Sequence, residues 1–206
     1  MVRAGIIGII LLFGASPAMA APEDPMPFGP GSLGFWINSY DGATDRYSEK
    51  VMSQGEGFEI YQVSSEYRSG EASDYYALFS GTYYASCDED MPNAEDRAEL
   101  KDLLPLAPEK TADIGAADDG TLISVLAPTE FFLMGRNWPA HSVKIQYRGE
   151  DPNEETVTVL DALPLTVRID WDDDSRDTLL LVTKPTSIAP DLDKSLIGNC
   201  ASLLNE

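Results

Sequence analysis

After residue 34 the chain is dominated by short runs in which apolar and polar residues alternate, the pattern of a strand with one buried face. In the run 58–63, Phe58 and Ile60 fall on one face while Tyr61 and Val63 fall on the other. Dipeptides such as Asp41-Gly42 separate the runs and favour hairpin turns. The pattern predicts strands over 35–40, 46–52, 58–63, 75–86, 122–126, 130–134, 142–147, 155–160, 165–171 and 178–183.

Two of these segments have further features. The run 75–86 is dense in aromatic residues, which predicts a central, well-buried strand or strand pair with a bulge at Gly81. The segment 172–175, Asp-Asp-Asp-Ser, predicts the turn of a hairpin between the last two strands.

One helix is predicted, over about 93–104. Asn93 is a suitable N-cap, and Glu95 and Asp96 lie in the first turn, where the helix dipole favours acids. Pro105 ends the helix. An apolar stripe of Leu100, Leu103 and Leu104 makes the helix amphipathic and able to lie on a sheet.

Many short strands and a single helix predict a mainly β fold, either an antiparallel sandwich or a partly open (half) barrel. The β-rich domain is expected to cover 35–206, with a division into two subdomains near 105–120 as the alternative to a single unit.

The N-terminus predicts export. Arg3 precedes an apolar run over 4–13, and the triplet 18–20, Ala-Met-Ala, is a cleavage signature, so residues 1–20 are predicted to be a signal peptide. The apolar run is too short for a membrane-spanning helix, so we expect no span after cleavage and a periplasmic or secreted protein. Residues 21–34 are rich in proline and glycine, and we expect an extended leader that packs little.

Charge and cysteine content narrow the partners and the redox state. The chain has 35 acidic and 14 basic residues, a net charge of −21. Such a surface repels phosphate backbones, so nucleic acid is excluded as a partner. Cys87 and Cys200 are the two cysteines, and in an exported chain we expect them to form a disulfide.

Candidate chemistry is sparse. No nucleotide, P-loop, zinc-hydrolase or redox motif occurs, so we expect no cofactor and assign no catalytic residue. His141, the one histidine, lies in a segment that suits a turn and is interpreted as structural or surface-exposed. Asp170, Asp172 and Asp174 have the spacing of calcium ligands, but Ser175 and Leu181 stand where a turn glycine and a bidentate acid belong, which favours a solvated hairpin tip.

Aromatic residues are the remaining candidates for a binding site. They could line a groove for a sugar or lipid, or they could pack between strands, which aromatic residues commonly do. The candidates for ligand binding are Trp36, Tyr61, Tyr76, Tyr84 and Trp138.

A series of short motifs in the C-terminal half, at 103–111, 134–136, 138–140, 142–145 and 163–167, resembles that of uncharacterised bacterial periplasmic β-proteins of the lipoprotein-carrier-like half-barrel type. Glu109 and His141 stand where that pattern has glycine. The resemblance implies a curved sheet with an apolar ligand on its concave side.

These observations favour an exported, non-catalytic protein that binds an apolar small ligand or an envelope protein. One alternative is a hydrolase of envelope polymers that uses a pair of Asp or Glu residues. The other is an acidic module that docks on a basic protein.

Overall fold

The computed structural model describes residues 26, 28–65, 74–116, 118–186, 190 and 192–205. The predicted signal peptide, residues 1–20, and the beginning of the leader lie outside the described residues.

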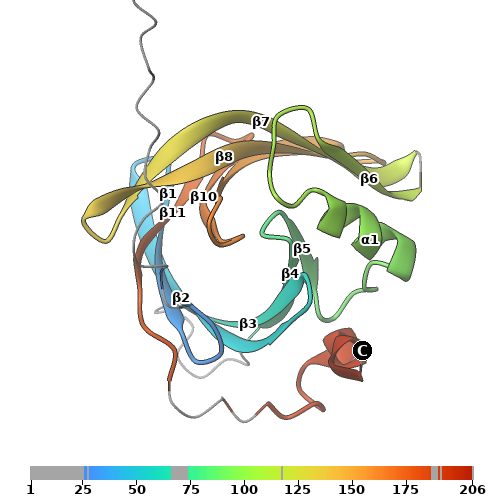
Figure 1. The fold of residues 1–206 in the computed structure, drawn as a ribbon, viewed down its shortest axis with the longest axis horizontal. Coiled ribbons are helices and arrows are strands. Elements are labelled where there is room, and N and C mark those ends of the chain that lie inside the picture. The colour runs from blue at the N-terminus through green and yellow to red at the C-terminus, as the bar shows by residue number, and fades with distance from the viewer. Residues whose placement is uncertain are drawn as a thin grey trace, which may run out of the picture.

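Within these described residues, eleven strands form one antiparallel sheet in the order β5-β4-β3-β2-β1-β11-β10-β9-β8-β7-β6. The sheet curls around an interior, with β2 and β3 facing β7 and β8 across it, and its two edge strands do not pair, so the barrel stays open (Figure 1). The predicted mainly β fold of the partly open barrel type is therefore confirmed. The strands are β1 (Leu33–Tyr40), β2 (Ala43–Gly55), β3 (Phe58–Ser65), β4 (Asp74–Phe79), β5 (Tyr83–Ser86), β6 (Thr111–Ala116), β7 (Asp119–Leu133), β8 (Arg136–Tyr147), β9 (Asn153–Leu160), β10 (Thr166–Trp171) and β11 (Arg176–Val182).

The turn predictions agree with the backbone. Asp41 and Gly42 both have positive φ, 42° and 76°, and join β1 to β2 as a tight hairpin. The segment 172–175 joins β10 to β11.

Three strand predictions need correction. The segments 122–126 and 130–134 belong to one long strand, β7, which accommodates Pro128 by a register shift between Val125 and Pro128 in its pairing with β8. Strand β6 was not predicted, and it lies with the start of β7 in the 105–120 segment, within the same sheet as all other strands. Strands β4 and β5 form the predicted pair, but β5 is an edge strand rather than a central one.

Gly81 lies in the β4–β5 turn and not in a bulge. Its φ is +68°, and an added Cβ would lie 2.3 Å from the carbonyl oxygen of Pro164, so glycine is needed on both counts. The Thr166 hydroxyl donates to the Gly81 carbonyl over 2.8 Å, which ties this turn across the interior to β10.

Helix α1 (Ala94–Asp102) covers the β6 edge. Asn93 caps it by accepting from the backbone N–H of Glu95 (2.8 Å) and Asp96 (3.1 Å), as predicted. Asp96 and Glu99 in turn accept from the backbone N–H groups of Gly115 and Asp113 on β6, at 3.2 and 3.0 Å. The acidic face of α1 therefore satisfies donors that an uncovered edge strand would offer to another chain.

The apolar stripe of the helix is narrower than predicted. Leu100 is fully buried and Leu103 is buried at the C-cap, whereas Leu104 is half-buried. Lys110 donates to the carbonyl groups of residues 102–105 and so satisfies the helix end. The neighbouring Glu109 has φ +73°, a conformation that favours glycine.

The predicted disulfide between Cys87 and Cys200 is present. It joins the end of β5 to the 3-10 helix η1 (Gly198–Asn205), and both cysteines are buried with Leu100, Ile197 and Leu203 in the largest apolar cluster. The C-terminal segment is therefore part of the core.

No helix in the described ranges is long and apolar enough to cross a membrane.

The described part of the leader packs more than predicted. Met26 is buried with Trp36, Trp138 and Leu179, and the ring of Phe28 lies 6.4 Å from that of Tyr61. The reason is that Met26 and Phe28 are apolar and pack against interior side chains of β1 and its neighbours.

Candidate functional site

Four of the five aromatic residues predicted to bind ligand lie together on the interior face of β1–β5. Trp36 stacks on Tyr47, with ring centroids 5.9 Å apart, and Tyr61 stacks on Tyr76 at 5.1 Å. Tyr84 lies 5.2 Å from Tyr76. The alternation of side chains along paired strands puts these residues on one face. We call Trp36, Tyr47, Tyr61, Tyr76 and Tyr84 the interior aromatic cluster.

Trp138 does not join this cluster. Its indole N–H donates to the Leu133 carbonyl over 3.0 Å, and the guanidinium of Arg136 lies 3.6 Å above its ring. The ring is buried and packs with Leu133 and Leu160 near the end of the β7–β8 hairpin.

Buried carboxyl groups border the interior aromatic cluster. Glu49 is 8 % exposed, Asp177 5 % and Glu155 3 %. Loss of solvation raises the pKa of Glu49 to about 7. Tyr76 and the Trp36 indole lie close enough to offset part of this rise, although neither donates to Glu49 with good hydrogen-bond geometry. At neutral pH this carboxyl group is therefore poised between its two protonation states.

Burial raises the pKa of two further acids. Burial raises the pKa of Glu59 to about 7 even though Gln54 donates to it over 3.2 Å. Burial also raises the pKa of Glu155, which accepts from the Tyr147 hydroxyl over 2.8 Å. The interior thus holds several carboxyl groups that resist ionisation.

Hydrogen bonding around these acids is incomplete among the described residues. The atoms without a partner there include Trp36 Nε1, the hydroxyl groups of Tyr61 and Tyr76, Glu155 Oε2 and Asp177 Oδ1. Sequence reasoning missed this grouping because the acids lie on separated strands.

The acidic hairpin tip is organised by arginines. Asp170 forms ion pairs with Arg168 and Arg176 on the outer face. Burial opposes ionisation of Asp170, but the hydrogen bonds from these two arginines outweigh it and lower the pKa. Asp174 has positive φ in the turn, and within the described ranges no group of three acids, histidines or cysteines could hold a metal ion.

His141 lies within β8 and not in a turn, which corrects the predicted position. It is buried, and its Nδ1 lies 2.6 Å from Asp161 Oδ1. The strand continues through Pro139 because that residue pairs opposite Glu130 in β7 without disrupting the ladder on either side.

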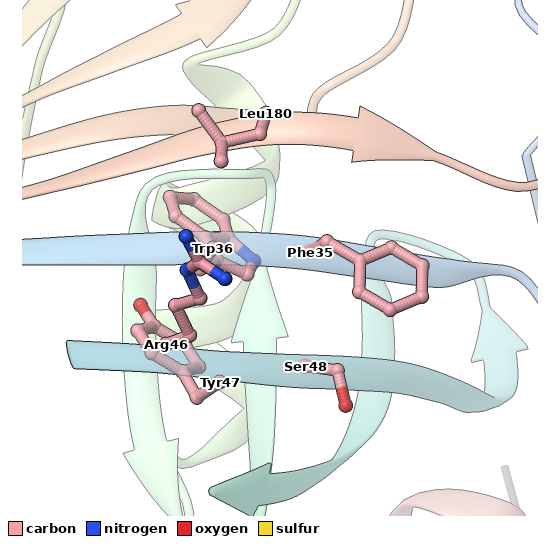
Figure 2. Close-up of a pocket in the computed structure, with 6 residues that line it drawn as sticks. All are labelled: Phe35, Trp36, Arg46, Tyr47, Ser48 and Leu180. Atoms are coloured by element: carbon pink, nitrogen blue, oxygen red, sulfur yellow. The ribbon is translucent and has the colours of Figure 1, made fainter. Parts of the chain in front are cut away.

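The outer face of β1, β2 and β11 carries an exposed apolar pocket of about 250 Å³. Phe35 is 39 % exposed, Leu180 53 % and Leu181 45 %. Figure 2 shows Phe35 on β1, Leu180 on β11 and Arg46 and Ser48 on β2 around this pocket, with Trp36 and Tyr47 completing its lining. We call Leu33, Phe35, Ile37, Leu180 and Leu181 the outer apolar strip.

Sequence reasoning missed this surface because two features of it are not local. Strands β1 and β11 are separated by more than 130 residues in the chain, and a register shift at Phe35 and Trp36 leaves Leu180 as an extra residue opposite them. The one signal in the local sequence is Phe35, an apolar residue that alternation places on the face opposite that of Trp36.

No protein-family model matches the sequence, and no curated protein matches it. Among solved structures, the chain is similar to MucB, with 12 % identity and a TM-score of 0.37 over 80 % of this chain and 56 % of that one. It is similar to MucB in complex with MucA(peri), with 11 % identity and a TM-score of 0.38 over 84 % and 55 % of the two chains. For the Pseudomonas aeruginosa MucA/MucB complex the values are 11 % and 0.36 over 82 % and 56 %. The chain spans about half the length of these matches.

Proposed function

We propose that this is an exported, non-catalytic binding protein of the bacterial cell envelope that contacts another protein through the outer apolar strip. The observation that carries the proposal is the exposure of Phe35, Leu180 and Leu181 side by side on the outer face. Contiguous exposed apolar side chains on a protein with a net charge of −21 are typical of interaction sites.

The burial of the interior acids favours binding on the outer face of the sheet over catalysis in its interior. Glu49, Glu155 and Asp177 are each less than a tenth exposed, beneath aromatic side chains. A polymer cannot reach carboxyl groups buried to this extent, so they do not support the hydrolase alternative. The stacked rings of the interior aromatic cluster support packing between strands, and not ligand binding, as the role of these residues.

Photo-crosslinking in intact cells tests the proposal. The photoreactive residue p-benzoylphenylalanine would replace Leu180 in one strain and Asp172, at the exposed end of the β10–β11 hairpin, in a control strain. We expect irradiation to yield one discrete adduct with another exported protein from position 180 and none from position 172. The absence of a position-specific adduct would refute the proposal.

A further inference from the structure

We infer that the partner docks on the outer apolar strip with an extended, acidic segment that places one bulky apolar side chain in the pocket. This inference rests on the proposed function and adds the chemistry of the partner. It follows from the arrangement of cations beside the strip, from their spacing and from the size of the pocket.

An apolar row and a basic row run side by side on this face. Leu33, Phe35 and Ile37 of β1 pair with Lys50, Ser48 and Arg46 of β2, so each apolar side chain has a polar or cationic neighbour across the ladder. A ligand on this surface therefore meets apolar contacts along one side and positive charge along the other.

The cations at this surface are unusual for the protein. Other basic side chains are paired, among them Lys101 with Glu56, Lys144 with Glu154 and Arg148 with Asp113. Among the described residues, the basic side chains that form no ion pair or hydrogen bond are Arg46, Lys50 and Lys184. Lys184 directly follows Thr183, which hydrogen bonds to Leu33 at the start of β1.

Cations without an ion pair are unexpected in this chain, because carboxylates that could pair with them are abundant. The chain has 35 acidic against 14 basic residues, yet the cations that are unpaired in the described part of the chain gather on and beside the strands that carry the pocket. A partner carboxylate can therefore pair with them without displacing an internal partner.

Spacing favours a peptide segment over a single charged headgroup. Arg46 and Lys50 are four residues apart on β2, and at a rise of about 3.3 Å per residue their backbones are separated by about 13 Å. One headgroup does not span that distance, whereas two acidic residues four positions apart in an extended segment have the same separation.

Pocket size agrees with this choice. Small-molecule sites usually occupy about 300–1,000 Å³. The volume here, about 250 Å³, is lined on one side by Phe35 and Leu180 and suits one large apolar side chain. A second copy of this chain and an anionic membrane are disfavoured as occupants, because a net charge of −21 repels both.

Selection from a random peptide library displayed on phage, with the wild-type protein as bait, tests the inference. We expect enriched peptides to carry two acidic residues around a phenylalanine, leucine or tryptophan. Binding of these peptides, measured by fluorescence anisotropy, should weaken about tenfold in the R46Q/K50Q variant, since two exposed ion pairs together contribute about 1.4 kcal/mol. It should also weaken as salt is raised.

Lys144→Gln is the matched control, because it removes an outer-face cation that is already paired with Glu154. It should leave peptide affinity unchanged, and thermal unfolding of R46Q/K50Q should match that of the wild type because Arg46 and Lys50 make no side-chain bond in the described structure.

Other outcomes would overturn the inference. They are enrichment of basic peptides, equal binding by R46Q/K50Q and wild type, a concentration-dependent dimer abolished by Leu180→Ser, and co-sedimentation with phosphatidylglycerol vesicles in place of peptide binding. If the cross-link from position 180 persists while the acidic preference is absent, the inference fails and the proposed function stands. Loss of the cross-link itself refutes the proposed function.

Discussion

Replacing the buried Glu49 with glutamine should stabilise the protein at alkaline pH. The carboxyl group has a pKa of about 7 in the folded protein against an ordinary value of 4.5, because burial removes its solvation. One pH unit of difference corresponds to about 1.4 kcal/mol, so ionised Glu49 costs the folded state on the order of 3 kcal/mol.

The sign follows from proton binding. The folded state holds the Glu49 proton more tightly than the unfolded state does, so Glu49 lowers stability as pH rises from about 4.5 to about 7 and adds no further change above that. The amide of glutamine has nearly the same shape and does not ionise. Glu49→Gln should therefore be close to wild type at pH 4.5 and about 3 kcal/mol more stable at pH 8.

Urea unfolding followed by tryptophan fluorescence, with the disulfide intact, measures this difference by linear extrapolation. The matched control is Glu154→Gln, which removes the same charge from an exposed site. Lys144 lowers the pKa of Glu154, so this control should gain no stability at pH 8. If Glu49→Gln is no more stable than the wild type at pH 8, the reasoning from burial is wrong.

Three further predictions concern the termini and the sheet edge. Replacing both Cys87 and Cys200 with alanine should lower the free energy of unfolding by about 4–5 kcal/mol in urea titrations, since the bridge closes a loop with a sequence separation of 113; a loss below 1 kcal/mol would contradict this. Glu99→Ala should cost about 1 kcal/mol and promote self-association in light scattering, because the Asp113 N–H on the β6 edge loses its acceptor; an unchanged monomer of unchanged stability would argue against edge protection. N-terminal sequencing of the protein from a periplasmic or culture fraction should begin at Ala21, and recovery with Met1 from the cytosol would disprove export.

Local features of the sequence predicted much of the fold. The Asp41-Gly42 turn, the Asn93 cap and most strands depend on residues close together in the chain, whose conformational preferences act before any long-range contact forms. Errors arose where a local signal was overruled. The sequence predicted two strands over 122–126 and 130–134, but a register shift accommodates Pro128 and keeps β7 continuous. The backbone N–H groups of Asp113 and Gly115 on β6 donate to Glu99 and Asp96 of α1, contacts that the residues of β6 do not reveal.

By itself the sequence determined the strand alternation, helix α1, the cysteine pair and the excess of acids, because each depends on residue type and short spacing. Only the tertiary structure decided that β1 pairs with β11, that Trp36 faces the interior while Phe35 faces outward beside Arg46, and that three separated acids share one buried region. The physical reason is that strand order and register are set by contacts between distant segments, which alternation within one strand does not specify.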